Sequence, residues 1–499
     1  MILSYINLIL GNLIPIFYLP IMLSMLGKNE YGLFKLATNL TSYLTLIALG
    51  IGGSITRYVI KANLEGGRDA EQRLFGLFSV MYDVVSVCAI AVGVFLALNL
   101  HWFYSEALNP DELGIMRMLV IVLTLNTAVQ MASIPCTTIV SAHERFVFVQ
   151  AMTIITTVAA PVLNLIILLM GFKSVGMVVG TLCLTVVVRA AYLIYCRSSL
   201  GLKPVYKQMP THLVKEIMIF SFWIFVSNVT SHLFGATDTV IIGAAPALAA
   251  AGVAVYSVGH QFSSILIGLS QVVPGFFMPR ANKMVLSGSD SEELTDLTIK
   301  VGRVQGYLMA LACFGFVAFG KQFLLLYVGE GYDEAYWVAV IVMIPNCIQL
   351  VQSVFISIMQ AKNMHSFRAK TYTLIAVANA IATYFLVRVY GVIGAAIPTA
   401  LCYLLGNGFL MNWFYHKRMK LNVPRFWKQI IPVFIPAVLL AAVALTLSIW
   451  VDFSYLPYFL IGVTVFTLIY FAICWKLVMT DEEKKLIIQP LGRFRRKKD

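Results

Sequence analysis

Charged residues are scarce in this chain of 499 residues. They make up 12% of the sequence, while hydrophobic residues make up 60%, and a typical soluble domain carries about 25% charged residues. Extended polar segments are also missing, because only short connections separate one apolar run from the next. This composition excludes an ordinary soluble enzyme and leaves no room for a soluble catalytic domain between the apolar runs.

Cysteine is rare as well, with eight residues in the chain. None of them forms a C-x-x-C pair, and all lie inside or at the ends of apolar runs, as Cys88 and Cys136 do. We expect them to act as small hydrophobic side chains, with no disulfide and no metal site. We also expect no cofactor.

Apolar runs of about twenty residues recur from one end of the chain to the other, and we count about fourteen of them. As a helix, each is long enough to cross a hydrocarbon core of about 30 Å. The first run has no basic flank and no small-residue cleavage site, so we expect a retained helix rather than a signal peptide. The expected fold is an all-α polytopic membrane protein, with helices over residues 2–25, 33–58, 74–98, 113–141, 146–169, 175–195, 213–242, 250–279, 301–325, 335–360, 371–387, 392–415, 430–450 and 456–477.

The charges that are present have an excess of one sign, with 36 Lys and Arg against 23 Asp and Glu, a net charge of +13. In a soluble protein this excess would suggest a nucleic-acid partner. Here the basic residues gather in every second connection and in the tail, so we expect no nucleic acid. By the positive-inside rule, both termini are expected in the cytoplasm, which requires an even number of helices. The tail is then a topology signal or a contact to anionic membrane lipids.

A weak internal repeat appears when the chain is shifted by about 220 residues. The shift places residues 30–32 on residues 250–252, and a similar one places Gly176 and Thr181 on Gly394 and Thr399. Because six helices return the chain to the same side, the two halves are expected to be parallel repeats. We therefore predict a six-helix bundle over residues 1–197, a second over 213–416, two additional helices over 426–478 and a basic cytoplasmic tail over 479–499.

Several short motifs, in order, resemble those of polysaccharide flippases of the Wzx type. The superfamily also contains MATE multidrug exporters and MurJ-type lipid II flippases. The resemblance covers essentially the whole chain, and its motifs are residues 26–32, Gly50-Ile51-Gly52, Thr56-Arg57-Tyr58, Asp238-x-x-Ile241-Ile242-Gly243, Gly252-x-x-x-Tyr256-Ser257 and Gly391-Val392-Ile393-Gly394-Ala395-Ala396.

This resemblance implies alternating access of a cavity between two bundles, in the bacterial inner membrane. It also implies a cargo, an oligosaccharide on undecaprenyl diphosphate, that moves from the cytoplasmic to the outer leaflet for surface polysaccharide synthesis. A coupling ion, either proton or sodium, belongs to such a transporter, and the resemblance leaves the choice open.

A diphosphate-linked glycan requires a cationic, hydrated path through the membrane, because its charges are costly to place in lipid. Arginine suits a diphosphate through its planar fork. Arg189 is the most informative candidate, since it lies about seven residues, roughly 10 Å, from the inner end of its predicted helix. Its alternative role is an ion pair with a carboxylate on a neighbouring helix. The candidate substrate-binding residues are Arg189, Arg117, Lys35, Arg57, Arg280 and Arg303. For the last three, a topology charge that reaches the lipid headgroups is the favoured alternative.

Three further residues are candidates for ion coupling. Asp83 lies close to the predicted bilayer midplane, where an unpaired carboxylate costs about 2.5–3.5 kcal/mol, so it is expected to be protonated, paired or ion-binding. Asp238 lies within a flippase-like motif, and His260 lies at mid-depth in its helix, where imidazole titrates near neutral pH. Each of the three has a purely structural alternative in interhelical hydrogen bonding or packing.

Two other function classes compete with the flippase. A MATE-like ion-coupled drug antiporter would be expected to have a more acidic cavity than these arginines indicate. A membrane glycosyltransferase usually needs a large outer loop with catalytic acids and bases, and the outer connections here are short. We therefore expect a transporter and no enzyme.

Overall fold

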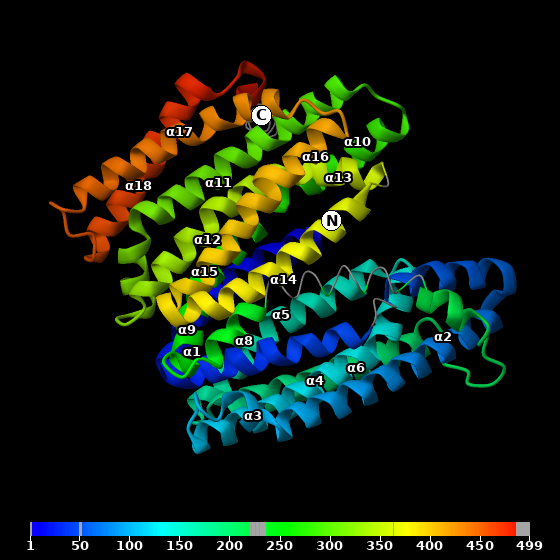
Figure 1. Ribbon diagram of the computed structural model, residues 1–499. Helices are drawn as coiled ribbons and strands as arrows, with labels where there is room; N and C mark the ends of the chain where they lie inside the picture. Colours follow the sequence, from blue (N-terminus) through cyan, green and yellow to red (C-terminus); the bar gives the residue numbers. More distant parts are fainter. Residues whose placement is uncertain are drawn as a thin grey trace, which may run out of the picture. The chain divides into compact units, whose positions relative to one another are not determined.

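The computed structural model describes residues 2–48, 52–219, 236–362 and 364–485, together with Ser221, Phe225 and Val229. Throughout these residues the chain is helical and contains no strand (Figure 1), which confirms the predicted all-α fold. The elements are α1 (Ile2–Ser42), η1 (Tyr43–Ala48), α2 (Gly52–Leu98), α3 (Leu100–Tyr104), α4 (Pro110–Ala142), α5 (Phe146–Leu169), α6 (Ser174–Ser198), α8 (Thr237–Gly243), α9 (Ala249–Ser270), α10 (Val272–Leu286), α11 (Ser291–Val328), α12 (Asp333–Val351), α13 (Ser353–Ala361), α14 (His365–Tyr390), α15 (Ile393–Tyr403), η2 (Leu404–Met411), α16 (Asn412–Lys417), α17 (Val423–Leu447), α18 (Leu456–Ile473) and η3 (Cys474–Val478).

Twelve helical segments among the described residues are long and apolar enough to cross a membrane. Most of the predicted helix over residues 2–25 and the first part of the one over residues 33–58 lie in one such segment, Leu10–Ala48, which is bent at Gly27 (φ 75°, ψ 168°). This conformation favours glycine. Residues 52–58 of the second predicted helix belong instead to α2. Part of the predicted helix over residues 213–242 lies outside the described residues. The chain is thus a multi-pass membrane protein, and the count of about fourteen helices stays a prediction.

The connection predicted over residues 60–73 differs from expectation. Instead of a polar turn, the structure has helix on both sides of Gly67, which interrupts α2 with φ 64° and ψ −159°. A polar composition does not prevent helix formation when the segment projects beyond the membrane, and a single glycine is enough to redirect it.

Sequence signals mark several helix starts. Asn109 and Glu112 form a capping box at the start of α4, where Glu112 Oε2 accepts a hydrogen bond from the Asn109 amide at 3.0 Å and Pro110 opens the helix. The side chain of Asn422 accepts the Arg425 amide at 3.2 Å and caps α17. Such caps satisfy amides that the first helical turn leaves without partners.

The described chain forms two compact units. Unit 1 contains Met1–Ser257 and Ala380–Val392, and unit 2 contains Val258–Asn379 and Ile393–Asp499. The division therefore runs through α9 and α14. The four predicted segments, residues 1–197, 213–416, 426–478 and 479–499, stay a prediction about the repeat.

In unit 1, α4 packs against both α2 and α6, and α1 packs against α4 and α5. Figure 1 shows α2, α4 and α6 running side by side along their lengths. The core between them contains Phe75, Phe78 and Tyr82 from α2, together with Ile139 from α4 and Tyr192 from α6. These aromatic residues hold the three helices together and fix the faces that stay exposed.

In unit 2, the long helix α11 packs against α12, α17 and α18. Phe355 stacks on Tyr415 with ring centroids 4.9 Å apart and meets Phe426 edge-on at the same distance, which joins α13, α16 and α17. The helices α17 and α18, which are the expected additional pair, are held against α11 by the packing described above.

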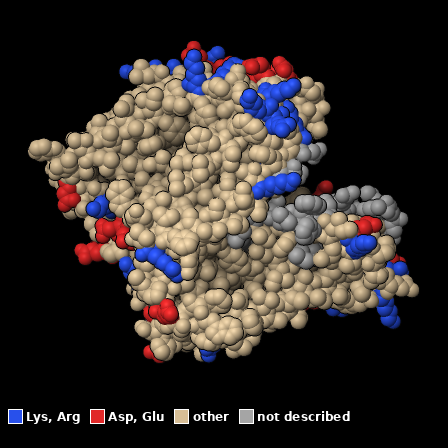
Figure 2. All heavy atoms as spheres, in the orientation of Figure 1, with Lys and Arg blue, Asp and Glu red and all other residues tan. Residues whose placement is uncertain are grey.

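Many apolar side chains lie on the surface of the helices, including Val147 at 72% and Leu468 at 64% exposure. Figure 2 shows the charged residues mainly near helix ends, with long stretches between them that carry few charges in this view. Lipid contact accounts for this pattern, since apolar side chains in a bilayer need no protein cover.

Candidate functional site

Arg189 and Asp83 form an ion pair between α6 and α2 in unit 1. The Arg189 Nη2 atom lies 3.8 Å from Asp83 Oδ1. This is close enough for attraction but too long for a hydrogen bond. The sequence analysis named these two residues as separate candidates. The structure shows that Arg189 pairs with a carboxylate on a neighbouring helix, which was the alternative role given for it above.

The pair lies on an exposed apolar face. The side chain of Asp83 is 54% exposed and that of Arg189 is 32% exposed. Val84 and Val87 beside Asp83, and Val187 beside Arg189, are more than half exposed. Arg189 lies nine residues before Ser198, about 14 Å along the helix, and Asp83 lies near the middle of α2 after Gly67. Charges at such depth are costly in lipid unless water or a partner charge is present.

The guanidinium group of Arg189 keeps most of its donors unused, because no hydrogen bond links it to another side chain or carbonyl in the described part of the chain. An arginine fork can donate two parallel hydrogen bonds to a phosphate or a carboxylate. A loose, one-point ion pair therefore compensates the charge of Arg189 and still leaves the group able to bind an anion.

Asp238 is the second ion-coupling candidate in unit 1, and it is buried, with 1% exposure. It lies in the first turn of α8, where Tyr256 Oη donates to its Oδ2 atom at 2.7 Å and Thr383 Oγ1 donates to its Oδ1 atom at 3.1 Å. The two donors come from α9 and α14. Hydrogen bonds to both oxygens stabilise the carboxylate and tie three helices together.

The helices around Asp238 approach α1 closely. A Cβ atom at Gly32 would lie 1.8 Å from the carbonyl oxygen of Ala250, and one at Gly243 would lie 2.6 Å from the Leu36 side chain. Only glycine permits this distance between the backbones. Gly32 and Ala250 belong to the two segments that the predicted internal repeat pairs with each other.

The remaining predicted cations of unit 1 are separate from this pair. Lys35 is partly buried on α1, with its Nζ atom 5.6 Å from the centre of the Tyr31 ring, which gives a cation–π contact. Arg117 is exposed on α4 beside the exposed Met118. The side chain of Arg57 lies outside the described part of the structure. None of these residues is brought to Arg189 by a contact in the described structure.

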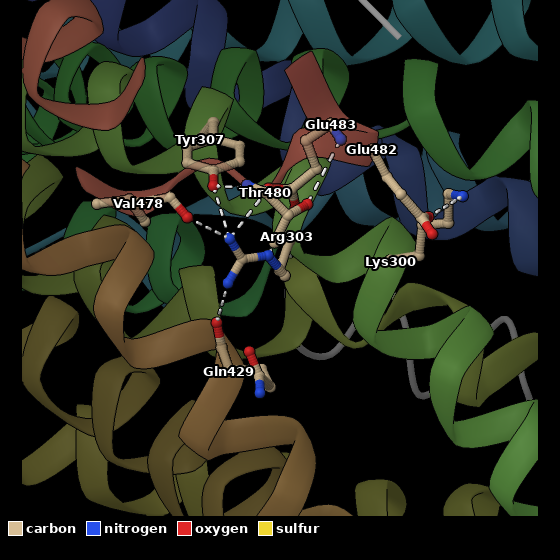
Figure 3. Close-up of polar contacts among 8 residues, drawn as sticks. All are labelled: Lys300, Arg303, Tyr307, Gln429, Val478, Thr480, Glu482 and Glu483. Carbon is tan, nitrogen blue, oxygen red and sulfur yellow. Dashed lines mark hydrogen bonds and ion pairs between the residues drawn. The ribbon is translucent and has the colours of Figure 1, made fainter. Parts of the chain in front are cut away.

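In unit 2, Arg303 lies in a buried cluster (Figure 3). Its guanidinium donates to both oxygens of Glu483, at 2.6 Å and 3.0 Å, and to Tyr307 Oη at 2.9 Å. It also donates to the carbonyl oxygens of Gln429 at 2.9 Å and Val478 at 2.7 Å. These contacts occupy the fork, so the structure gives Arg303 a partner inside the protein in place of the predicted diphosphate.

Glu483 completes this cluster from beyond the last predicted membrane helix. It accepts the Thr480 amide at 2.8 Å, which makes Thr480 to Glu483 a helix-starting capping box. Burial raises the pKa of the Glu483 carboxyl, but the hydrogen bonds and charge of Arg303 and the bonds from Thr480 leave it below its usual range. The sequence analysis missed this residue, although the T-x-x-E signature was present.

Two other predicted residues of unit 2 have looser surroundings. Arg280 is exposed on α10 and borders an open cavity of about 890 Å³ that Lys300 and Arg425 also line. His260 on α9 has its Nδ1 atom 3.5 Å from the Ser264 hydroxyl.

The sequence analysis also missed two buried glutamates of unit 1, which lie just after the bends in α1 and α2. Glu30 accepts hydrogen bonds from the Ser174 amide and hydroxyl, both at 2.8 Å, and lies 3.4 Å from Lys173. Glu71 lies 2.6 Å from His143 Nε2. Both contacts join segments far apart in sequence, so local patterns gave no signal for them.

A family model described as polysaccharide biosynthesis protein matches residues 1–276. The chain belongs to this family. A curated relative, the probable low-salt glycan biosynthesis flippase Agl15 of Haloferax volcanii, is 22% identical over 194 residues, which span 39% of this chain and 40% of the relative. The match therefore covers less than half of that protein.

Two solved structures share the fold over most of their lengths. The lipid II flippase MurJ, in an inward closed conformation, has a TM-score of 0.70 at 12% identity and covers 98% of both chains. A multidrug resistance MATE family transporter in an inward-facing conformation has a TM-score of 0.63 at 12% identity, over 85% of this chain and 95% of its own. These findings confirm the resemblance to Wzx-type flippases and their superfamily.

Proposed function

We propose that this protein is an alternating-access flippase for an undecaprenyl-diphosphate-linked oligosaccharide. It moves this cargo from the cytoplasmic to the outer leaflet of the bacterial inner membrane, with both termini in the cytoplasm. The family, and the flippase names of Agl15 and MurJ, support the class of activity. The Arg189–Asp83 pair is the observation that carries the choice of an anionic cargo.

The argument for an anionic cargo starts from the exposure of this pair. A charged pair on an exposed face at this depth is compatible with a hydrated path and costly against lipid alone. Asp83 is monodentate and 3.8 Å away. A diphosphate that accepts two hydrogen bonds can therefore displace it from Arg189. The pair thus acts as an exchangeable site for the cargo headgroup.

Alternating access is supported by the contact between α1 and α9. The charge alternation of the sequence assigns the turn before Gly32 and the turn before Ala250 to the outer side. Their backbone contact then closes this side of unit 1, and parting of the two segments would open it. Because Gly32 has no side chain at this contact, no interlocked side chain has to move aside when the two segments part. The free energy needed to separate them is therefore low.

Ion coupling is assigned in this proposal to Asp238. Its carboxylate is buried and held by hydroxyl groups from two other helices, so a proton or sodium ion that binds it would change the contacts among α8, α9 and α14. Asp83 serves instead as the counter-charge of Arg189, and His260 remains a secondary candidate. Replacing Asp238 with Asn should remove the dependence of transport on the ion gradient.

The test measures flipping of a fluorescent lipid-linked oligosaccharide in liposomes. Arg189→Ala should lower the rate by about tenfold or more, and Arg189→Lys should retain part of it, since lysine keeps the charge but loses the fork. Arg197→Ala is the matched control, because Arg197 is an exposed arginine at the end of the same helix. Normal transport by Arg189→Ala would refute the assignment of a cargo site to Arg189.

A MATE-like ion-coupled drug antiporter is the second candidate. The shared fold with a MATE transporter and the buried acid Asp238 favour it. The same liposomes distinguish the two functions if they are loaded with a cationic dye in place of the glycan lipid. Gradient-driven dye transport that Asp238→Asn abolishes and Arg189→Ala preserves would favour the antiporter.

A further inference from the structure

The connection after α6 is fixed along α2 in unit 1. Arg68 donates to the Leu200 carbonyl oxygen at 2.9 Å, and the Val205 amide donates to the Gln72 carbonyl oxygen at 3.0 Å. A Cβ atom at Gly76 would lie 2.1 Å from the carbonyl oxygen of Val205, so the two backbones touch. The connection is therefore held as a wall beside α2.

A cavity of about 340 Å³ lies between this wall and α2. Leu74 and Leu213 contribute apolar surface, while Arg73, His212 and Tyr58 contribute groups that can donate hydrogen bonds. A pocket with an apolar part and several donors fits an amphipathic ligand with an anionic head.

Two of these donors, on Arg73 and His212, are available for a ligand. Arg73 and His212 are exposed, and neither forms an ion pair or hydrogen bond with another residue that the structure describes. Among the lining residues that the structure describes, Glu216 is the one carboxylate, and it is exposed. Three further lysines are exposed in the connection and at the start of the next helical stretch, namely Lys203, Lys207 and Lys215. Their positive charges exceed the single negative charge of Glu216.

The position of the pocket along the chain indicates the source of the ligand. The charge alternation of the sequence assigns this connection to the cytoplasmic side. Residues 213–219 are helical, and Met218 and Ile219 are exposed at 37% and 59% one turn beyond Leu213. A pocket with basic donors next to an exposed apolar helical face lies where lipid headgroups meet acyl chains.

We propose that this pocket binds the phosphate group of an anionic lipid in the cytoplasmic leaflet, with Arg73 and His212 as its donors. The apolar part of the pocket takes the first carbons below the headgroup, and the lysines of the connection attract anionic lipid to it. The site is distinct from Arg189 and does not depend on the identity of the transported cargo. Its lipid is either a bulk phospholipid or a polyprenyl phosphate, and these share the chemistry of a membrane-anchored phosphate.

Native mass spectrometry of the delipidated full-length protein tests the proposal by titration with phosphatidylglycerol. The combined variant Arg73→Gln with His212→Gln should weaken binding of one phosphatidylglycerol by about tenfold or more, because charge-assisted hydrogen bonds are lost. Arg145→Gln is the control, since Arg145 is exposed on the same predicted side but does not line the pocket. Ala70→Trp keeps every charge and fills the cavity, so it should also abolish the tight site.

The competitors decide the source of the phosphate. Phosphatidylcholine should not displace phosphatidylglycerol, and displacement by undecaprenyl phosphate would support the site and assign it to the cargo carrier. Displacement by millimolar inorganic phosphate would overturn a lipid site. The proposal would also be overturned if Arg145→Gln lost as much phosphatidylglycerol binding as the double variant, or if Ala70→Trp kept full binding. Either result would mean that general surface charge, and not the pocket, attracts the lipid.

Discussion

Removal of Arg303 should release the segment after α18 from the body of unit 2. Arg303 and Glu483 each have 7% side-chain exposure, and the guanidinium makes five hydrogen bonds in this cluster. Breaking a buried pair by removing one partner costs about 3–5 kcal/mol, since the other charge stays buried without compensation. Each step of about 1.4 kcal/mol is a factor of ten, so the detached state of residues 479–485 should become at least about a hundredfold more populated.

Hydrogen exchange followed by mass spectrometry measures this population directly. In Arg303→Met, amides of residues 480–485 should exchange at least about a hundred times faster than in the unmodified protein. Lys300→Met is the matched control, because its pair with Glu482 is 3.1 Å long but exposed, at 39% and 79%. Exposed pairs contribute about 0–1 kcal/mol, so the control should change exchange by less than about fivefold.

Acid should produce the same release. The pKa of Glu483 is lowered in the folded chain. Its contribution to stability is therefore fully present above the unfolded value of about 4.3 and is lost as pH falls through the folded value. The detached population of residues 480–485, obtained from exchange after correction for the intrinsic amide rate at each pH, should rise below about pH 4 and show little change between about pH 6 and 8. Unchanged exchange in Arg303→Met, or an equal effect of Lys300→Met, would refute the reasoning from buried charge.

Two further predictions concern unit 1. Gly32→Ala should markedly lower thermal stability in detergent, because its Cβ would fall 1.8 Å from the Ala250 carbonyl oxygen, whereas Gly11→Ala meets no atom within 4 Å and should be neutral or slightly stabilising. Equal melting of the two variants would contradict the close approach. Asp83→Asn should reduce the yield of folded protein by leaving Arg189 unpaired, and the double variant Asp83→Asn with Arg189→Gln should recover the yield without transport. Recovery of both properties in the double variant would show that the pair has no role in binding cargo.

The class of fold could be predicted from hydropathy because a chain in lipid has little choice of backbone structure. Every amide in the hydrocarbon core needs an internal partner, so apolar runs of sufficient length become helices. The bends at Gly27 and Gly67 were harder to predict, since a glycine followed by a basic residue, as Gly27 is by Lys28 and Gly67 by Arg68, is equally typical of a turn. Both glycines have a positive φ inside a helix, and only coordinates report this combination.

The candidate site was predictable as a set of residues that need partners, but the partners themselves were not. Depth in the membrane required Asp83 and Arg189 to be compensated, and the structure joins them across α2 and α6. The same logic applied to Arg303 suggested a topology charge or a cargo ligand, because its carboxylate partner is remote in sequence. Pairing across the fold depends on which helix faces meet, and a hydropathy pattern contains no information on that choice.

The geometry of the Arg189–Asp83 pair explains how one group can serve both insertion and transport. A solitary arginine at this depth costs about 2.5–3.5 kcal/mol to insert, and a nearby carboxylate reduces this cost. A close bidentate pair would reduce it further but would also hold the guanidinium too firmly for exchange. The two groups lie 3.8 Å apart, and Asp83 is more than half exposed. Their attraction is therefore weak enough for a diphosphate to replace the carboxylate. In the proposed cycle, Asp83 then regains Arg189 when the cargo leaves, and the charge of the empty site is compensated before the next headgroup arrives.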